Sequence, residues 1–220
     1  GCKLVVADIS ADALVSVAAE VEALGSDTVA VEVDVSDQGS VDALAARAFD
    51  AFGRVHFLCN NAGVGVPRGG GMYVWDTSLA EYDWVMGANV GGILHGCRAF
   101  VPALLAQDEA SHILNTVSIA GLLTRGATHV YTMSKHAALS ISESLVAQLA
   151  VLDASISVSI LCPGFVDTSL AQSDTVAPRG IQALREEDGE TAVFGDMRAH
   201  FEASIRNGMS PDDVADAAIA

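Results

Sequence analysis

The sequence has 220 residues, of which 51% are hydrophobic, and 28 acidic against 11 basic side chains give it a formal charge of −17. This length suits a single domain with a sizeable core, and the strong negative charge argues against a nucleic-acid partner. No apolar run reaches the ~18 residues of a membrane span, and no secretory leader begins the chain, so we expect no membrane partner and a cytoplasmic location.

Short apolar runs alternate with helical patterns along the chain. Buried strands are expected at residues 3–8, 28–34, 55–60, 111–118 and 155–162. Helices are expected from the cap Ser10 to Gly25, from the cap Ser36 to about Gly53, from the cap Ser78 to about Leu105, over 129–152 and after Ser210. Continuous apolar strands separated by helices are typical of a parallel sheet covered on both faces, which predicts a doubly wound, three-layer α/β fold in a single domain over 1–220.

Residues from about 170 to 208 do not follow this pattern. The stretch is polar and only weakly periodic. We interpret it as a mobile flap over a substrate, with one or two helices of its own.

Cysteine and histidine spacings give no indication of a metal site. The four cysteines show no CxxC or CxxH spacing, and the six histidines are dispersed. We therefore expect no metal, and we interpret the cysteines as small buried thiols.

Each of the five expected strands ends in small or polar residues. In order, these ends are Asp8, Asp34–Val35, Asn60–Gly63, Ser118 and Pro163–Gly164. Such residues also favour ordinary loops, so no single one of them indicates a site. Together they predict a rim for a polar, extended ligand, because ligands of open α/β sheets bind beyond the carboxyl ends of the strands.

The strongest constellation joins Ser118, Tyr131 and Lys135. The spacing of four residues between Tyr131 and Lys135 places a phenol and an ammonium group on one face of a helix. A tyrosine with its usual pKa of about 10 is a poor base at neutral pH, and a fixed positive charge nearby favours the phenolate. An isolated pair of this kind is usually surface decoration, whereas one that follows a strand-end serine by 13 residues indicates acid–base chemistry.

Four motifs together resemble the classical short-chain dehydrogenases/reductases. They are NNAG at 60–63, Ser118, YTMSK at 131–135 and CPGFVDT at 162–168, in the family's order and with its gaps. The likeness runs along essentially the whole chain. It implies a Rossmann-like dinucleotide-binding fold, and a homotetramer or homodimer built on the helices at 78–105 and 129–152.

The resemblance implies a role for each catalytic position. Tyr131 would be the acid/base that exchanges a proton with the substrate oxygen, and Lys135 would lower the pKa of Tyr131 and hold the nicotinamide ribose. Ser118 would hydrogen-bond the substrate oxygen where charge develops. Asn89 would hold a water of a proton relay at an irregular turn of its helix, which neighbouring glycines make easy.

The resemblance also implies NAD as the cofactor, with NADP less favoured. Asp8 would bind both hydroxyls of the adenosine ribose and repel a 2′-phosphate, and no Arg or Lys follows at 9–13 to attract one. Val166 and Thr168 would bind the nicotinamide carboxamide. The complete set of implied cofactor-binding residues is Asp8, Ile9, Asp34, Val35, Asn60, Asn61, Ala62, Gly63, Tyr131, Lys135, Pro163, Gly164, Val166 and Thr168.

One part of the family's pattern is missing. The stretch GVGVPRGGGM at 63–72 is interrupted by Pro67 and Arg68, and no helix begins directly after it, so we interpret it as a loop near the mouth of the site rather than a phosphate loop. We expect a partial sequence that lacks roughly 30 residues of a first strand–helix unit, and the last strand as well. The missing first strand would lie between strands 3–8 and 55–60, so direct pairing of those two would contradict this expectation.

The leading hypothesis is an NAD-dependent oxidoreductase that interconverts a secondary alcohol and a ketone, with Tyr131 moving the proton. A non-catalytic dinucleotide-binding sensor or scaffold is a less favoured alternative, because such proteins usually lose the tyrosine or the lysine. A third reading is an epimerase or dehydratase of the same family, although those relatives tend to carry a larger C-terminal domain. The sequence does not identify the substrate, and it slightly favours a mostly apolar secondary alcohol.

Overall fold

The computed structural model describes residues 2–65, 73–124, 129–178, 181 and 192–219. Most of the glycine-rich stretch that we interpret as a mouth loop lies outside these residues, at 66–72. Part of the predicted flap, at 179–180 and 182–191, also lies outside them.

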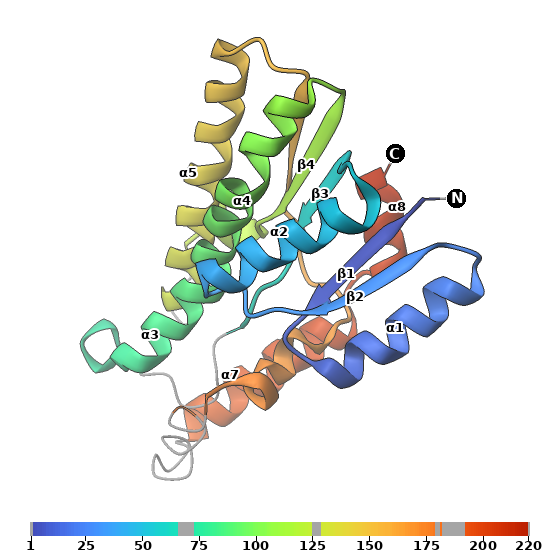
Figure 1. The fold of residues 1–220 in the computed structure, drawn as a ribbon. Helices are drawn as coiled ribbons and strands as arrows, with labels where there is room; N and C mark the ends of the chain where they lie inside the picture. The colour runs from blue at the N-terminus through green and yellow to red at the C-terminus, as the bar shows by residue number, and fades with distance from the viewer. Residues whose placement is uncertain (1, 66–72, 125–128, 179–180, 182–191, 220) are drawn as a thin grey trace.

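Two parallel sheets form the centre of the molecule (Figure 1). Their strands are β1 (Leu4–Asp8), β2 (Thr28–Glu32), β3 (Phe57–Asn60), β4 (Ser111–Thr116) and β5 (Ile156–Leu161). The first sheet has the order β1-β2 and the second the order β3-β4-β5. All five strands predicted from the sequence are present, each ending within two residues of the expected position. Because the strands within each sheet are parallel, their polar carboxyl ends share one edge.

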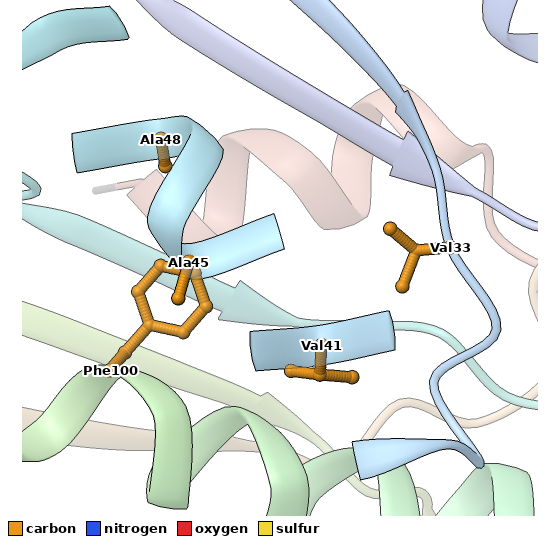
Figure 2. Close-up of a cluster of buried hydrophobic side chains, with 5 residues drawn as sticks. All are labelled: Val33, Val41, Ala45, Ala48 and Phe100. Atoms are coloured by element: carbon orange, nitrogen blue, oxygen red, sulfur yellow. The ribbon is translucent and has the colours of Figure 1, made fainter. Parts of the chain in front are cut away.

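Within the described residues, no hydrogen-bonded ladder joins β1 to β3. The direct pairing that would contradict an intervening strand is therefore not observed. The two sheets share one buried cluster, shown in Figure 2, against which Val5 of β1 and Leu58 of β3 both pack. The cluster includes residues of helix α2 (Gln38–Phe52) and consists of Val33, Val41, Ala45, Ala48 and Phe100.

Helices α4 (Gly92–Gln107) and α5 (His129–Val151) cover the second sheet. Helix α1 (Ala11–Ala23) packs against β1 and β2. The core beneath α4 and α5 contains Leu104, Ile113, Leu145, Leu149 and Ile156. These side chains come from both helices and from β4 and β5, so their burial fixes α5 against the strands that carry the site.

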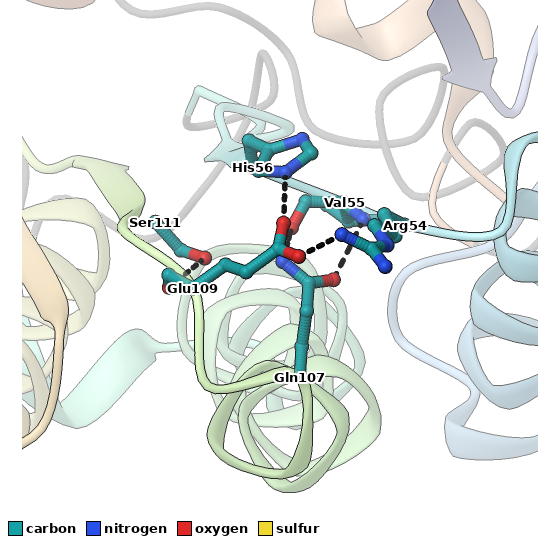
Figure 3. Close-up of polar contacts among 6 residues, drawn as sticks. All are labelled: Arg54, Val55, His56, Gln107, Glu109 and Ser111. Carbon is teal, nitrogen blue, oxygen red and sulfur yellow. Dashed lines mark hydrogen bonds and ion pairs between the residues drawn. The ribbon is translucent and has the colours of Figure 1, made fainter.

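Polar contacts attach the start of β3 to the end of α4 (Figure 3). The Gln107 side chain accepts a hydrogen bond from the Val55 N–H at 3.2 Å and donates one to the Val55 carbonyl at 3.0 Å. Glu109 contacts both Arg54 and His56, the latter at 2.9 Å. These contacts fix the register in which β3 enters the sheet.

The expected helix ends at Ser10, Gly25, Gly53 and Ser78 are present, and the one at Ser36 is not. Ser10 caps α1 by accepting from the Ala13 N–H at 3.3 Å. Gly25 and Gly53 both have the positive φ that a left-handed helix end requires, at 86° and 76°. The prediction that Ser36 caps α2 is wrong. Asp37 is the cap, because the Ser36 hydroxyl donates instead to Asp34 at 2.7 Å.

The long helix predicted from Ser78 is interrupted. It comprises α3 (Leu79–Met86), a π-helical turn η2 (Gly87–Gly91) and α4. The glycines of this region allow a close approach to the loop after β2, because a Cβ built on Gly92 would lie 3.0 Å from Val35 Cγ2. The π-helical turn η2 contains Asn89, so the irregular turn expected around this residue is present.

The predicted flap region contains two described helices. They are the 3₁₀ helix η5 (Ser169–Val176) and α7 (Ala192–Arg206), and α8 (Pro211–Ile219) follows them. The base of the flap is closed by Met209, whose N–H donates to the Phe165 carbonyl and whose carbonyl accepts from the Asp167 N–H, both at 2.9 Å. Among the described helices, none has the length and apolar character needed to cross a membrane.

Candidate active site

A cavity of about 990 Å³ reaches from the carboxyl ends of the strands to Phe57 at the start of β3 and to residues of α8. Residues that end or follow all five strands line it, as the sequence analysis expects of a ligand site in such a fold. Of the predicted site residues, the cavity is lined by Asp8, Ile9, Asp34, Val35, Asn61, Ala62, Gly63, Ser118, Tyr131, Lys135, Pro163, Gly164, Val166 and Thr168. The two that do not line it are Asn60 and Asn89.

Ser118, Tyr131 and Lys135 come together on one wall of this cavity, which we call the catalytic wall. Ser118 follows β4 and begins the short helix η3 (Ile119–Gly121), and its side chain hydrogen-bonds that of Tyr131. Lys135 lies one turn further along α5. Its Nζ donates to the Thr116 carbonyl at 3.2 Å and lies 5.7 Å from the centre of the Tyr131 ring.

Burial shifts both titrating groups of the catalytic wall toward their neutral forms. It raises the pKa of Tyr131, and the hydrogen bond from Ser118 offsets only part of this. Burial also lowers the pKa of Lys135 to about 8, with the charge of Cys162 acting in the opposite direction. Lys135 is not among the causes of the Tyr131 shift, so the expected lowering of the Tyr131 pKa by Lys135 stays a prediction.

Asn89 lies in the π-helical turn, and its side chain hydrogen-bonds the backbone of the loop after β3. Only 1% of its surface is exposed. Its Oδ1 accepts from the Val64 N–H at 2.7 Å, and its Nδ2 donates to the Val64 carbonyl and to Ser134 Oγ, each at 3.0 Å. Ser134 in turn donates to the Tyr131 carbonyl at 2.7 Å. The Asn89 side chain therefore fixes the loop after β3 relative to the turn that carries Tyr131.

Asn60 turns away from the cavity into the sheet. Its Nδ2 donates to Asn115 Oδ1 at 2.9 Å, and the Asn115 amide donates to Ser142 Oγ at 3.0 Å. A Cβ built on Gly96 would lie 2.2 Å from Asn60 Oδ1, so α4 passes directly over this amide. Sequence reasoning missed Asn115 and Ser142, since only the β3–β4 register brings them beside Asn60.

The acidic rim, formed by Asp8 and Asp34 after β1 and β2, lies at the other end of the cavity. Both carboxylates are exposed and are held by local turns, Asp8 by the Ser10 N–H and Asp34 by the Ser36 N–H, each at 2.9 Å. Sequence reasoning missed His95 of α4, which contacts the residue after Asp34. Its Nδ1 lies 2.8 Å from the Val35 carbonyl. Together with Lys135, these two acids are the only charged side chains among the described cavity residues.

The third part of the cavity wall is apolar. It comes from α3, the segment after β5, η5 and α7, and its large side chains are Trp84, Phe165, Leu170, Val176, Phe201 and Ile205. Leu170 and Val176 belong to the stretch that the sequence analysis interprets as a flap. These apolar side chains line the same cavity as Ser118 and Tyr131.

The residues present suit a dinucleotide cofactor. Carboxylates at one end match ribose hydroxyls, and Lys135 is a hydrogen-bond donor at the other. Thr116, whose carbonyl accepts from Lys135, has a buried Oγ1 with no hydrogen-bond partner in the described structure. This hydroxyl therefore lacks the partner that buried polar groups normally have. The described residues contain no cluster of three or more potential metal ligands. The interpretation of the cysteines as buried thiols is wrong, because Cys2 and Cys59 are exposed and Cys97 and Cys162 are only half-buried.

Comparison with known proteins decides the family. The chain matches the family described as short chain dehydrogenase over residues 1–178. This chain belongs to the short-chain dehydrogenase family. The prediction made from the motifs is confirmed, and so is the Rossmann-like α/β fold, which characterises these NAD(P)-binding oxidoreductases.

Individual members of the short-chain dehydrogenase family show the extent of the match. A 1-deoxy-11-beta-hydroxypentalenate dehydrogenase of Streptomyces avermitilis is 37% identical over 90% of this chain and 70% of its own length. A protein of the same name from Streptomyces exfoliatus is 39% identical over 82% of this chain, which spans 64% of that relative. A crystal structure of a family member from Burkholderia phymatum in complex with NAD has 41% identity and a TM-score of 0.89, covering 98% of this chain and 74% of that one.

Proposed function

We propose that this short-chain dehydrogenase interconverts an apolar secondary alcohol and its ketone, with NAD as the cofactor. The observation that carries the proposal is the catalytic wall, where Ser118 and Tyr131 share a hydrogen bond at the cavity and Lys135 lies beside them. An acid/base hydroxyl next to a second hydroxyl donor is what transfer of a proton to or from a carbinol oxygen requires.

Each residue of the wall has a task in this reaction. Tyr131 exchanges a proton with the substrate oxygen, and Ser118 donates a hydrogen bond to that oxygen as charge develops on it. Lys135 holds the nicotinamide ribose, and its Nζ lies 5.7 Å from the centre of the Tyr131 ring. Asn89 positions the loop and the helical turn that surround these groups. A bound nicotinamide supplies the hydride acceptor or donor.

The acidic rim supports NAD rather than NADP. The exposed Asp8 carboxylate has an oxygen available for ribose hydroxyls, and it would repel a 2′-phosphate. Apart from Lys135 at the opposite end, the described cavity residues include no cation that could attract such a phosphate.

The apolar wall supports the substrate class. Aromatic and aliphatic side chains surround the space beside Tyr131, and a charged substrate would find no compensating charge among them. Two relatives are named for oxidation of a hydroxypentalenate, which agrees with a hydroxyl group as the reacting centre.

The enzyme would assemble as a homodimer or homotetramer through α4 and α5. Leu94, Leu105 and Val146 on these helices are between 39% and 44% exposed, which leaves apolar surface for such an interface. Light scattering of the purified protein would measure the number of subunits. The Val146→Asp variant, which places a charge in the proposed interface, should have fewer subunits.

The test of the proposed function is an activity screen of the full-length protein. NAD and NADP are each combined with a series of secondary alcohols that runs from polyols to hydrocarbon-like cyclic alcohols. We expect turnover with NAD and an increase in kcat/KM along the series toward apolar substrates. Turnover confined to charged or polyhydroxylated substrates would overturn the substrate class, and absence of turnover with every alcohol and ketone would overturn the activity.

A further inference from the structure

Three consecutive residues, Gly63–Gly65, connect the catalytic wall to the flap helix η5. Gly63 packs against the catalytic side. A Cβ built on it would lie 3.0 Å from Asn89 Oδ1 and 3.5 Å from Lys135 Nζ. Because the contact is this close, the position of the Gly63 backbone limits where both side chains can lie.

Val64 continues this connection toward Tyr131. Its N–H and carbonyl are both held by the Asn89 amide, at 2.7 and 3.0 Å. Asn89 then donates to Ser134, and Ser134 donates to the Tyr131 carbonyl. A continuous chain of hydrogen bonds therefore runs from the Val64 backbone to the turn of α5 that carries the acid/base residue.

Gly65 is held from the opposite side, by η5. Its N–H donates to Ser173 Oγ at 2.9 Å, and the Ser173 hydroxyl donates to the Leu170 carbonyl at 2.6 Å. A Cβ built on Gly65 would lie 3.0 Å from that same carbonyl. Gly65 is buried and Ser173 is only 9% exposed, so the loss of the serine hydroxyl would leave a buried N–H without its partner.

The same helix faces the substrate space. Its residues Leu170, Gln172, Ser173, Thr175 and Val176 line the cavity. A substrate that packs on η5 therefore contacts the element that holds Gly65.

We propose that Ser173 is a positioning residue through which the flap helix sets the geometry of the proton-transfer groups. Ser173 holds Gly65, and the fixed Gly63–Gly65 backbone keeps Asn89 and Lys135 in place around Tyr131. This inference rests on the proposed function, because it concerns proton transfer at Tyr131.

A purely local role for Ser173 leads to a different expectation. Its donation to Leu170 spans only three residues of η5, whereas its acceptance from Gly65 joins segments 108 residues apart. Only the second contact reaches the catalytic wall. A variant that removes a local hydroxyl-to-carbonyl bond of the flap without touching Gly65 should therefore leave proton transfer unchanged.

The kinetic test compares Ser173→Ala with Ser173→Thr and with Ser204→Ala in the full-length protein. Ser204 is the matched control, because it lies in α7 of the same flap and its hydroxyl donates to the His200 carbonyl at 2.8 Å. In Ser173→Ala we expect kcat for alcohol oxidation to fall about tenfold while the Kd for NAD changes by less than about twofold. The pH profile of kcat should move to higher pH by about half a unit, because the Lys135 ammonium, whose positive charge favours the phenolate, is held less firmly beside Tyr131.

Ser173→Thr retains the hydroxyl and should restore kcat and the pH profile, and Ser204→Ala should match the unmodified enzyme. A Ser173→Ala kcat within about twofold of the unmodified enzyme, or a loss of kcat without a shift of the pH profile, would overturn the proposal. If Ser173→Ala does not fold, Ser173→Cys provides the same comparison, because it keeps the volume and weakens the hydrogen bond.

Hydrogen exchange tests the connection without catalysis. Peptides that contain Gly63–Gly65 should exchange faster in Ser173→Ala than in Ser204→Ala. Equal exchange in the two variants would overturn the inference even if the enzyme is active. Faster exchange in a protein that never turns over an alcohol would instead count against the proposed function and leave the structural connection in place.

Discussion

The catalytic wall and the acidic rim are held in place in different ways. Lys135 is 5% exposed and reaches a carbonyl 19 residues away, and Asn89 holds a backbone 25 residues away. Asp8 and Asp34 are exposed, and each is held by a backbone N–H two residues further on. The wall therefore depends on the whole fold, whereas the rim depends on two short turns.

This difference separates proton transfer, which depends on the catalytic wall, from the choice of cofactor, which depends on the acidic rim. Changes near the wall should affect proton transfer and stability together, because its residues are buried and share hydrogen bonds. Changes at the rim should affect the choice of cofactor alone, since exposed side chains with local contacts contribute little to stability.

The largest expected effect concerns pH. Burial raises the pKa of Tyr131, so the tyrosine stays protonated at neutral pH, and alcohol oxidation requires the minor phenolate form. The oxidation rate should rise about tenfold per unit from about pH 6 toward pH 8, and less steeply above the Lys135 pKa of about 8, where the ammonium is lost.

Ketone reduction should stay level over the same interval, because the protonated phenol is the form that it uses. Steady-state rates in both directions would measure this. An oxidation rate that is flat between about pH 6 and 8 would contradict a raised Tyr131 pKa.

The second effect concerns stability behind the wall. Gly96→Ala would place a Cβ 2.2 Å from Asn60 Oδ1, which forces the Asn60–Asn115 contact apart. We expect the free energy of unfolding to fall by about 2–3 kcal/mol. Gly39→Ala is the control, because its Cβ would meet Asp37 Oδ1 at 3.5 Å and the change should be neutral or stabilising. Chemical denaturation measures both, and equal stabilities would refute the tight contact.

The smallest effect is expected at the rim. Asp8→Ala should reduce the preference for NAD over NADP, measured as a ratio of kcat/KM values, by about tenfold. The free energy of unfolding should stay within about 0.5 kcal/mol of the original. Asp12→Ala removes the same charge from α1 at a residue that does not line the cavity, and should leave the ratio as it was. An Asp8→Ala ratio equal to that of Asp12→Ala would remove Asp8 from cofactor selection.

Local patterns in the sequence were sufficient to predict the elements. Apolar runs and caps such as Ser10 and Gly53 placed every described strand and the main helices to within a few residues. The cap of α2 was misassigned because Ser36 and Asp37 can both cap a helix, and only the folded loop shows that Ser36 is occupied by Asp34.

What the sequence could not show are properties that arise when distant segments meet. The orientation of Asn60 depends on its register with Asn115, and the contact of Ser173 with Gly65 depends on where the flap helix docks. The pKa of Tyr131 depends on desolvation by its neighbours, and the four-residue spacing between Tyr131 and Lys135 does not reveal this desolvation. The motifs placed the chemistry on the right wall, but not the backbone connections that hold it.

The most direct test of the account is a comparison of Tyr131→Phe with the unmodified full-length protein. Turnover and the Kd for NAD are measured together, the latter by titration of the cofactor. The account predicts that kcat falls by about three orders of magnitude while the Kd for NAD stays within about twofold, because only the proton-transferring hydroxyl is removed. Retention of turnover in Tyr131→Phe would contradict the central claim that the catalytic wall carries the reaction.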